Sequence, residues 1–126
     1  MSIQKDCLYL KTHEWVKFTT ETTAQVGISD FAVESLGDIV FLNLPQVGDT
    51  VSIDTSFADV ESVKAVSDVF CPVSGVVTAV NEALADAPEQ INEHPYDAWF
   101  IEVSEIFARG ELLTPEEYEQ HCAQEE

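Results

Sequence analysis

The chain has 126 residues, 45% of them hydrophobic, so its length and composition fit one folded domain spanning residues 1–126 with a modest core. Its 24 acidic and five basic residues give a formal net charge of −19. A surface this acidic repels nucleic acid and anionic membranes, and it favours protein partners with basic faces. We therefore expect no nucleic-acid partner, and no stretch of the sequence reaches the length of a membrane span.

The N-terminus and the cysteines bear on the cellular compartment. Residues 1–6 have neither the apolar stretch of a secretory signal nor the Arg-rich pattern of a transit peptide. The three cysteines, Cys7, Cys71 and Cys122, are odd in number and far apart, so they suggest no disulfide framework. We expect a cytoplasmic protein, and a mitochondrial-matrix protein only if the chain is a processed organelle form.

Taken in chain order, the sequence predicts a mainly β fold. Strands are expected where Val, Ile, Phe and Thr cluster or alternate with polar residues, at 14–19, 23–28, 38–44, 57–61, 66–71, 75–80 and 98–103. Turn signals rich in Pro, Gly and Asp separate them at 45–49, 72–75 and 88–95.

Two helices are well signalled and a third more weakly. Ser29 to Gly37 begins with a favourable N-cap and ends on a glycine suited to terminate a helix. A short helical turn is expected at 81–86. Thr114-Pro115-Glu116-Glu117 forms a capping box with proline at the first helical position, which predicts a C-terminal helix at about 114–123.

The sequence contains none of the motifs that are typical of catalytic or metal sites. The sequence has no G-x-S-x-G elbow, phosphate-binding glycine loop or dinucleotide fingerprint. The histidines, His13, His94 and His121, have no partner at metal-ligand spacing, so we interpret each as a surface or hydrogen-bonded residue and expect no metal. Cys71 lies in an apolar strand without a nearby base, which indicates a core residue and not a nucleophile.

Lys64 stands out because it is the only basic residue between Lys17 and Arg109. Strand-like segments flank it, which predicts a hairpin at about 57–71 with Lys64 near the tip, although the turn lacks Gly and Pro. A hairpin tip is accessible to a modifying enzyme and lets a tethered group swing.

The charges beside Lys64 bear on what it can do. Its neighbours Glu61 and Asp68 favour the ammonium form, so Lys64 is a poor Schiff-base nucleophile and a better attachment site. The alternative is an ordinary solvated lysine.

Blocks along nearly the whole chain are similar to one known family. They are His13–Val16, Val26–Ala32, Leu36–Phe41 with Leu44-Pro45, Val60–Ala65 with Ser67-Asp68, Pro72–Gly75, Val80–Leu84, Asn92 with Pro95-Tyr96 and Trp99, and Leu112–Tyr118. In these blocks the sequence resembles the H protein family of the glycine cleavage system. It departs from the family pattern at Asp97-Ala98, where glycines are usual, and at Cys71, where a smaller or more polar residue is common.

The resemblance implies a barrel-sandwich hybrid of the lipoyl- and biotinyl-carrier type, with two β-sheets, small peripheral helices and a C-terminal helix. It implies that Lys64 carries lipoate as a covalent amide, and that the chain is a monomeric carrier and not an enzyme, with no catalytic residue of its own.

The resemblance also implies a set of partners. The chain would carry the aminomethyl group of glycine from the pyridoxal-phosphate decarboxylase (P protein) to the aminomethyltransferase (T protein). Dihydrolipoamide dehydrogenase (L protein) would reoxidise it, and lipoate-attaching enzymes would modify it.

In this family the loaded arm can fold against the protein surface, where an acid would hold its cationic amine. Glu14 is our first candidate for that acid because it falls in one of the similar blocks. The alternative is that Glu14 is one more solvated carboxylate.

Three other functions remain open at the level of sequence. The chain could be an H-like lipoyl carrier that mainly relays lipoyl groups to other complexes. It could be a biotin carrier, although those domains usually flank the lysine with methionines, whereas Val63 and Ala65 flank Lys64. It could also be an unmodified acidic interaction module.

Overall fold

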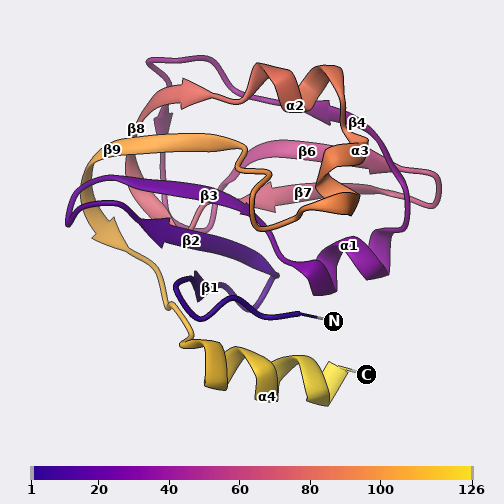
Figure 1. The fold of residues 1–126 in the computed structure, drawn as a ribbon. Coiled ribbons are helices and arrows are strands. Elements are labelled where there is room, and N and C mark those ends of the chain that lie inside the picture. The colour runs from indigo at the N-terminus through magenta and orange to yellow at the C-terminus, as the bar shows by residue number, and fades with distance from the viewer. Residues whose placement is uncertain (1, 126) are drawn as a thin grey trace.

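The computed structural model describes residues 2–125, and two antiparallel β-sheets form an open sandwich in that part of the chain (Figure 1). The larger sheet has the order β1 (Leu8–Tyr9), β2 (Glu14–Phe18), β3 (Ala24–Ile28), β9 (Ile101–Arg109), β8 (Val73–Val80) and β5 (Thr50–Val51). The smaller sheet has the order β4 (Ile39–Asn43), β6 (Ser56–Ser62) and β7 (Val66–Phe70). The helices are α1 (Asp30–Leu36), α2 (Glu82–Asp86), α3 (Glu89–Glu93) and α4 (Pro115–Glu125).

The predicted fold class is confirmed: the protein is mainly β, with two sheets, small helices at the periphery and a C-terminal helix. The facing sides of the sheets supply the main core, because alternate residues of a strand point to the same face. Val26 and Val103 of the larger sheet and Val60 and Val69 of the smaller sheet are at most 1% exposed within it.

A second, smaller core lies under α4, which Figure 1 shows alongside β1. It comprises Cys7, Tyr9, Trp15, Tyr118 and Cys122, all buried. The rings of Tyr9 and Tyr118 stack with centroids 4.2 Å apart, and β1 also pairs with Leu113 just before the helix. These contacts fix α4 against the edge of the larger sheet.

Helix α1 has the ends that its sequence predicts. The Ser29 hydroxyl accepts a hydrogen bond from the N–H of Ala32 at 3.3 Å, as an N-cap does. At the other end, the N–H of Gly37 donates to the Val33 carbonyl, and Gly37 has φ 79° and ψ −154°. Glycine alone adopts this conformation readily because a side chain would strain it.

The structure differs from the predicted elements most clearly at β9, β1, β5 and α3, and β8 begins at Val73, inside the predicted turn 72–75. Strand β9 begins at Ile101 and continues to Arg109, whereas the sequence indicated 98–103. The short strands β1 and β5 were not predicted, because two residues carry too little pattern to be recognised. Helix α3 occupies part of the segment 88–95 that was expected to be a turn, and its five residues follow Pro88.

Two other sequence features have structural outcomes. Asp97 and Ala98, which replace the family's glycines, are not among the residues with positive φ in the described part of the chain. None of the helices within residues 2–125 combines the length and apolar character that a membrane crossing requires.

Candidate functional site: the lysine hairpin and the buried glutamate

Lys64 lies in the exposed tight turn that joins β6 to β7. The last pair of the ladder is Glu61 with Val66, and the N–H of Ser62 then donates to the Ala65 carbonyl at 2.8 Å to close the turn. The Ser62 hydroxyl oxygen accepts from the N–H groups of Lys64 and Ala65, both at 3.1 Å. The hydrogen bonds to the Ser62 side chain therefore stabilise this turn, although the turn contains neither Gly nor Pro.

The loop that follows α1 supports the hairpin from one side. The N–H of Val63 donates to the Asp38 carbonyl at 3.0 Å. Asn92 of α3 holds this loop in turn: its amide donates to the Gly37 carbonyl and accepts from the N–H of Ile39, each at 2.9 Å. The lysine turn is thus connected by hydrogen bonds through this loop to α3.

The aliphatic part of the Lys64 side chain passes Gly37. A Cβ added at Gly37 would lie 3.5 Å from Lys64 Cε and 3.9 Å from Val63 Cγ2, which is ordinary contact distance. Within residues 2–125 the ammonium group of Lys64 has no ion-pair partner.

Exposed apolar residues lie beside Lys64 in the hairpin and on the neighbouring strand. Val63 and Val66 flank it in the turn and are 68% and 67% exposed. Val40 and Phe41 lie on the neighbouring strand β4, where Phe41 pairs with Glu61 of the hairpin, and both are about half exposed. We call these four residues the apolar collar. Exposed apolar residues gathered at one place are typical of a contact surface for another protein.

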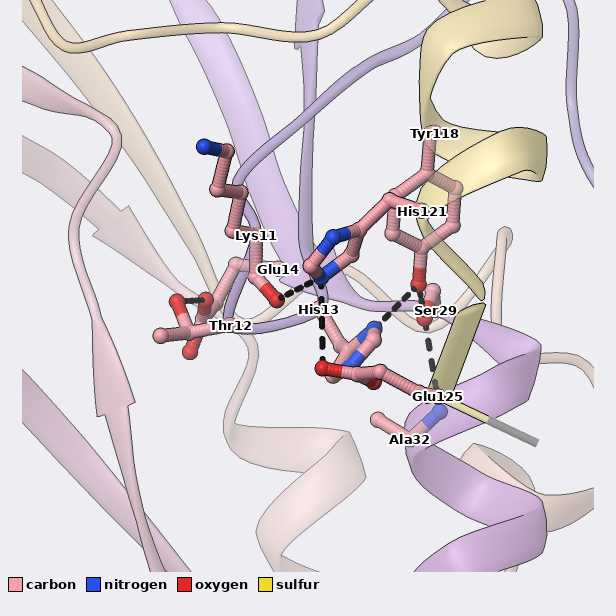
Figure 2. Close-up of polar contacts among 9 residues, drawn as sticks. All are labelled: Lys11, Thr12, His13, Glu14, Ser29, Ala32, Tyr118, His121 and Glu125. Carbon is pink, nitrogen blue, oxygen red and sulfur yellow. Dashed lines mark hydrogen bonds and ion pairs between the residues drawn. The ribbon is translucent and has the colours of Figure 1, made fainter. Parts of the chain in front are cut away.

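Glu14, the predicted shelter residue, is buried at 2% exposure at the start of β2, so its interpretation as a solvated carboxylate is wrong. One carboxylate oxygen accepts from the N–H of Phe70 at 2.9 Å. The other accepts from the Thr12 hydroxyl (Figure 2). Burial raises the pKa of Glu14 to about 7, even though both hydrogen bonds oppose that change.

Glu14 and Lys64 are joined by a single strand. Phe70, which donates to Glu14, ends β7, and β7 begins two residues after Lys64. Its five residues cover roughly 13 Å from Val66 to Phe70 at the usual rise of a strand. A long flexible group on Lys64 that lay along β7 would therefore extend toward the glutamate.

A hollow of about 150 Å³ lies beside Glu14. Its lining includes Thr12, which binds the Glu14 carboxylate, together with the acidic residues Asp54 and Glu111. The lining also includes one cation, Lys11. The carboxylates of Glu14, Asp54 and Glu111 outnumber it, which favours a cationic group there.

The other residues considered in the sequence are one cysteine and three histidines, and two of the histidines lie unexpectedly close together. Cys71 is fully buried, and burial raises its pKa to about 11, which keeps the thiol protonated, as expected of a core cysteine. His94 is exposed. His13 and His121, however, lie close together beside Glu125, although nothing in their sequence spacing indicated it.

Sequence reasoning missed the supporting residues of this site. Thr12 and the Phe70 backbone bind Glu14, and Asn92 braces the loop under the hairpin. One available signal was the alternation in β2, which places Glu14 on the same face as the core residue Val16 and so indicates its burial. The contacts of Glu14 with Phe70 and of Asn92 with Ile39 join residues more than 50 positions apart, which no local pattern encodes.

Comparison with known proteins agrees with these features. The sequence model of the family "Glycine cleavage H-protein" matches residues 7–125. The chain is 56% identical over 125 residues to a glycine cleavage system H protein of Lachnoclostridium phytofermentans, covering 99% of this chain and 98% of that protein. A glycine cleavage system H protein of Listeria monocytogenes is 50% identical over 122 residues, covering 94% and 97%.

A solved structure extends the similarity to three dimensions. The crystal structure of a glycine cleavage system H protein from Mycobacterium marinum superposes with a TM-score of 0.91 at 43% sequence identity, covering 96% of this chain and 99% of that one. The family match, the near-complete coverage of the relatives and the shared two-sheet fold agree with one another, and the chain belongs to the glycine cleavage H-protein family.

Proposed function

We propose that Lys64 carries lipoate as an amide, and that residues 1–126 act as one monomeric carrier in the cytoplasm, not as an enzyme. The observation that carries this proposal is the placement of Lys64 in a chain of this family: it is exposed in a hydrogen-bonded turn between two strands. The turn presents the amine to a modifying enzyme without disturbing the sandwich.

The residues around Lys64 fit an uncharged acyl arm. Forming the amide removes the ammonium charge, and no described acid loses an ion-pair partner when it does so. The apolar collar offers a surface that suits a hydrocarbon chain. Methionines, which usually flank the lysine of biotin carriers, are absent from the two positions beside Lys64, so lipoate is the better fit.

When bound, lipoate would supply a dithiolane ring whose disulfide is reduced as it accepts the aminomethyl group released by the glycine decarboxylase (P protein). The aminomethyltransferase (T protein) takes the group, and dihydrolipoamide dehydrogenase (L protein) restores the oxidised form. Lipoate-attaching enzymes complete the set of partners. The residues of this chain present the arm, dock it on partners and protect what it carries.

Protection is the role we propose for Glu14. Its buried carboxylate lies beyond the far end of β7, beside a hollow lined by Thr12 and Asp54. A cationic amine there would favour the carboxylate form of Glu14, and the surrounding protein would exclude water from a labile group. Glu14→Ala should then speed hydrolysis of the loaded arm. Equal hydrolysis rates in wild type and variant would rule the role out.

Reconstitution tests the carrier function. The chain is combined with the P, T and L proteins, and glycine-dependent CO2 exchange is measured for wild type, Lys64→Arg and the matched control Lys17→Arg, whose lysine is also exposed. We expect exchange with wild type and Lys17→Arg and none with Lys64→Arg, while all three keep the same circular dichroism and melting temperature. Exchange supported by Lys64→Arg would refute the proposal, and a lipoylated wild type that supports none would instead indicate the relay function.

A further inference from the structure

The side chains of His13, His121 and Glu125 converge where α4 meets the loop before β2, as Figure 2 shows. One ligand atom from each lies within 4.8 Å of the other two. His13 Nε2 is 2.6 Å from one carboxylate oxygen of Glu125, and His121 Nε2 is 3.3 Å from the other. His121 and Glu125 are four residues apart on α4, so they share one face of the helix.

The orientation of His13 is fixed from several sides. Its ring stacks on Phe31 with centroids 4.5 Å apart, and its Nδ1 is 2.8 Å from the Tyr118 hydroxyl. That hydroxyl is 2.5 Å from the Ser29 hydroxyl, which also accepts from the N–H of Ala32. Without a metal, a hydrogen on His13 Nε2 donates to the Glu125 carboxylate. With that hydrogen moved to Nδ1, where it donates to the Tyr118 hydroxyl, the Nε2 lone pair is directed at the same place.

The backbone holds His13 in the same place. The residue has φ 81°, its N–H donates to the Leu10 carbonyl at 3.0 Å, and its carbonyl accepts from the N–H of Ser29 at 2.9 Å. Positive φ is uncommon for residues other than glycine, so the surrounding structure imposes it. A ring held by stacking, by a hydroxyl at Nδ1 and by its backbone resembles a metal-binding histidine, whose second nitrogen is normally hydrogen-bonded.

We propose that His13 Nε2, His121 Nε2 and the Glu125 carboxylate form a binding site for a divalent transition-metal ion of the Zn²⁺ type. Two imidazoles and a carboxylate are a common zinc ligand set, with water in the fourth position. With zinc–ligand bonds of about 2.0–2.2 Å, neighbouring ligand atoms of a tetrahedron lie about 3.3 Å apart. The observed separations of 2.6 and 3.3 Å approach that value, and side-chain rotation supplies the remaining shift.

Binding requires each histidine to carry its hydrogen on Nδ1 and not on Nε2. His121 Nε2 now donates to the Lys11 carbonyl oxygen at 3.0 Å, so this nitrogen carries the hydrogen. When the metal takes Nε2, the hydrogen is carried by Nδ1 and the ring stays neutral, so His121 exchanges its hydrogen bond to the Lys11 carbonyl oxygen for the metal bond.

The metal would join α4 to the loop that leads into Glu14 at the start of β2. His13 directly precedes Glu14 in the chain, whereas both other ligands belong to the C-terminal helix. A ligand that binds only the folded state raises the melting temperature, so zinc would stabilise the docked position of α4.

Calorimetric titration of the full chain with ZnCl2, without reductant, tests the site. We expect one tight equivalent of Zn²⁺ and much weaker binding of Mg²⁺, which prefers oxygen ligands. His121→Ala and His13→Asn should each weaken zinc binding at least tenfold, and asparagine is chosen because it tolerates positive φ. The matched controls, His94→Ala for an exposed histidine and Glu119→Gln for an exposed acid of α4, should bind as wild type does.

The results that overturn the proposal are distinct. Zinc affinity unchanged in His121→Ala would exclude the site even if His13→Asn failed to fold. Several weak equivalents that all variants share would assign the binding to the acidic surface. Lys64→Arg should retain the tight equivalent, so the outcome does not depend on whether Lys64 carries lipoate. Co²⁺ provides a second readout: the intense visible absorption of a four-coordinate site should appear in wild type and be lost in His121→Ala.

Discussion

At the scale of single residues, Glu14 is the clearest example of burial changing chemistry. It is the only buried acidic side chain within residues 2–125, and burial raises its pKa to about 7. Hydrogen bonds from Thr12 and Phe70 keep the carboxyl group satisfied inside the protein. A group that is half ionised near neutral pH can respond to a cation brought beside it, because the cation favours the carboxylate form.

The raised pKa makes a prediction about stability. Between about pH 4.5 and pH 7 the folded state holds the Glu14 proton while the unfolded state releases it, so stability falls as pH rises, with the full cost present above pH 7. Glu14→Gln removes this cost but keeps the shape. Its free energy of unfolding relative to wild type should rise by about 2–3 kcal/mol from pH 4.5 to pH 8.

Urea denaturation at the two pH values measures this change. Because both proteins share all other acids, the difference between their two curves isolates Glu14. A difference that stays constant with pH would show that Glu14 titrates normally.

At the scale of elements, the hairpin relies on a neighbouring loop. Asn92 in α3 bonds both Gly37 and Ile39, and the loop between them bonds the turn that holds Lys64. Asn92→Ala leaves a partly buried carbonyl and N–H without partners, which should lower the free energy of unfolding by about 1–3 kcal/mol.

The matched control is Asn43→Ala. Asn43 bonds Asp59 on the exposed side of the smaller sheet, and its loss should change stability by less than about 0.5 kcal/mol. Thermal and urea melts of both variants supply the comparison. Equal effects at the two asparagines would mean that the loop does not depend on α3.

The apolar collar makes a prediction about modification. Phe41 is about half exposed one strand away from the lysine turn, and we expect a lipoate-attaching enzyme to contact it. Phe41→Ser should slow lipoylation about tenfold, which corresponds to about 1.4 kcal/mol of lost contact energy.

Phe107→Ser is the control, because Phe107 is 82% exposed on β9 of the other sheet. Its lipoylation should proceed at the wild-type rate, as followed by intact mass over time. If both variants were modified as fast as wild type, the collar would not be part of the recognition surface.

At the scale of the whole molecule, amino-acid composition predicted the charge of the surface but not the position of the functional site. The formal charge of −19 indicated basic protein partners, and the apolar collar adds one place where an enzyme could dock on that acidic surface. Opposite charges speed the encounter of two proteins, while apolar contacts hold them together once they meet.

The sequence predicted the fold class and most strands, since each is a local pattern of apolar residues read directly from the chain. It also predicted α1 and α4 from their caps, Ser29 and Thr114. It missed β1 and β5, which are two residues long, and α3, which replaces a predicted turn.

The site was less predictable because its contacts are long-range. Isolation in sequence singled out Lys64, but only folding brings Glu14 to Phe70. The same is true of His13 and Glu125, which are 112 residues apart and gave no metal-ligand spacing. Sequence patterns relate residues that are close in the chain, whereas the sheet order and the docking of α4 determine which residues are close in space.

The central claim is that Lys64 is the point of attachment for lipoate, and mass spectrometry of the chain isolated from its native host tests it most directly. The account predicts a single lipoyl addition to the intact chain, located by fragmentation on the peptide that contains Lys64 and absent from Lys5, Lys11 and Lys17. A biotinyl addition, a lipoyl group on another lysine, or an unmodified Lys64 in cells that carry out glycine cleavage would contradict it.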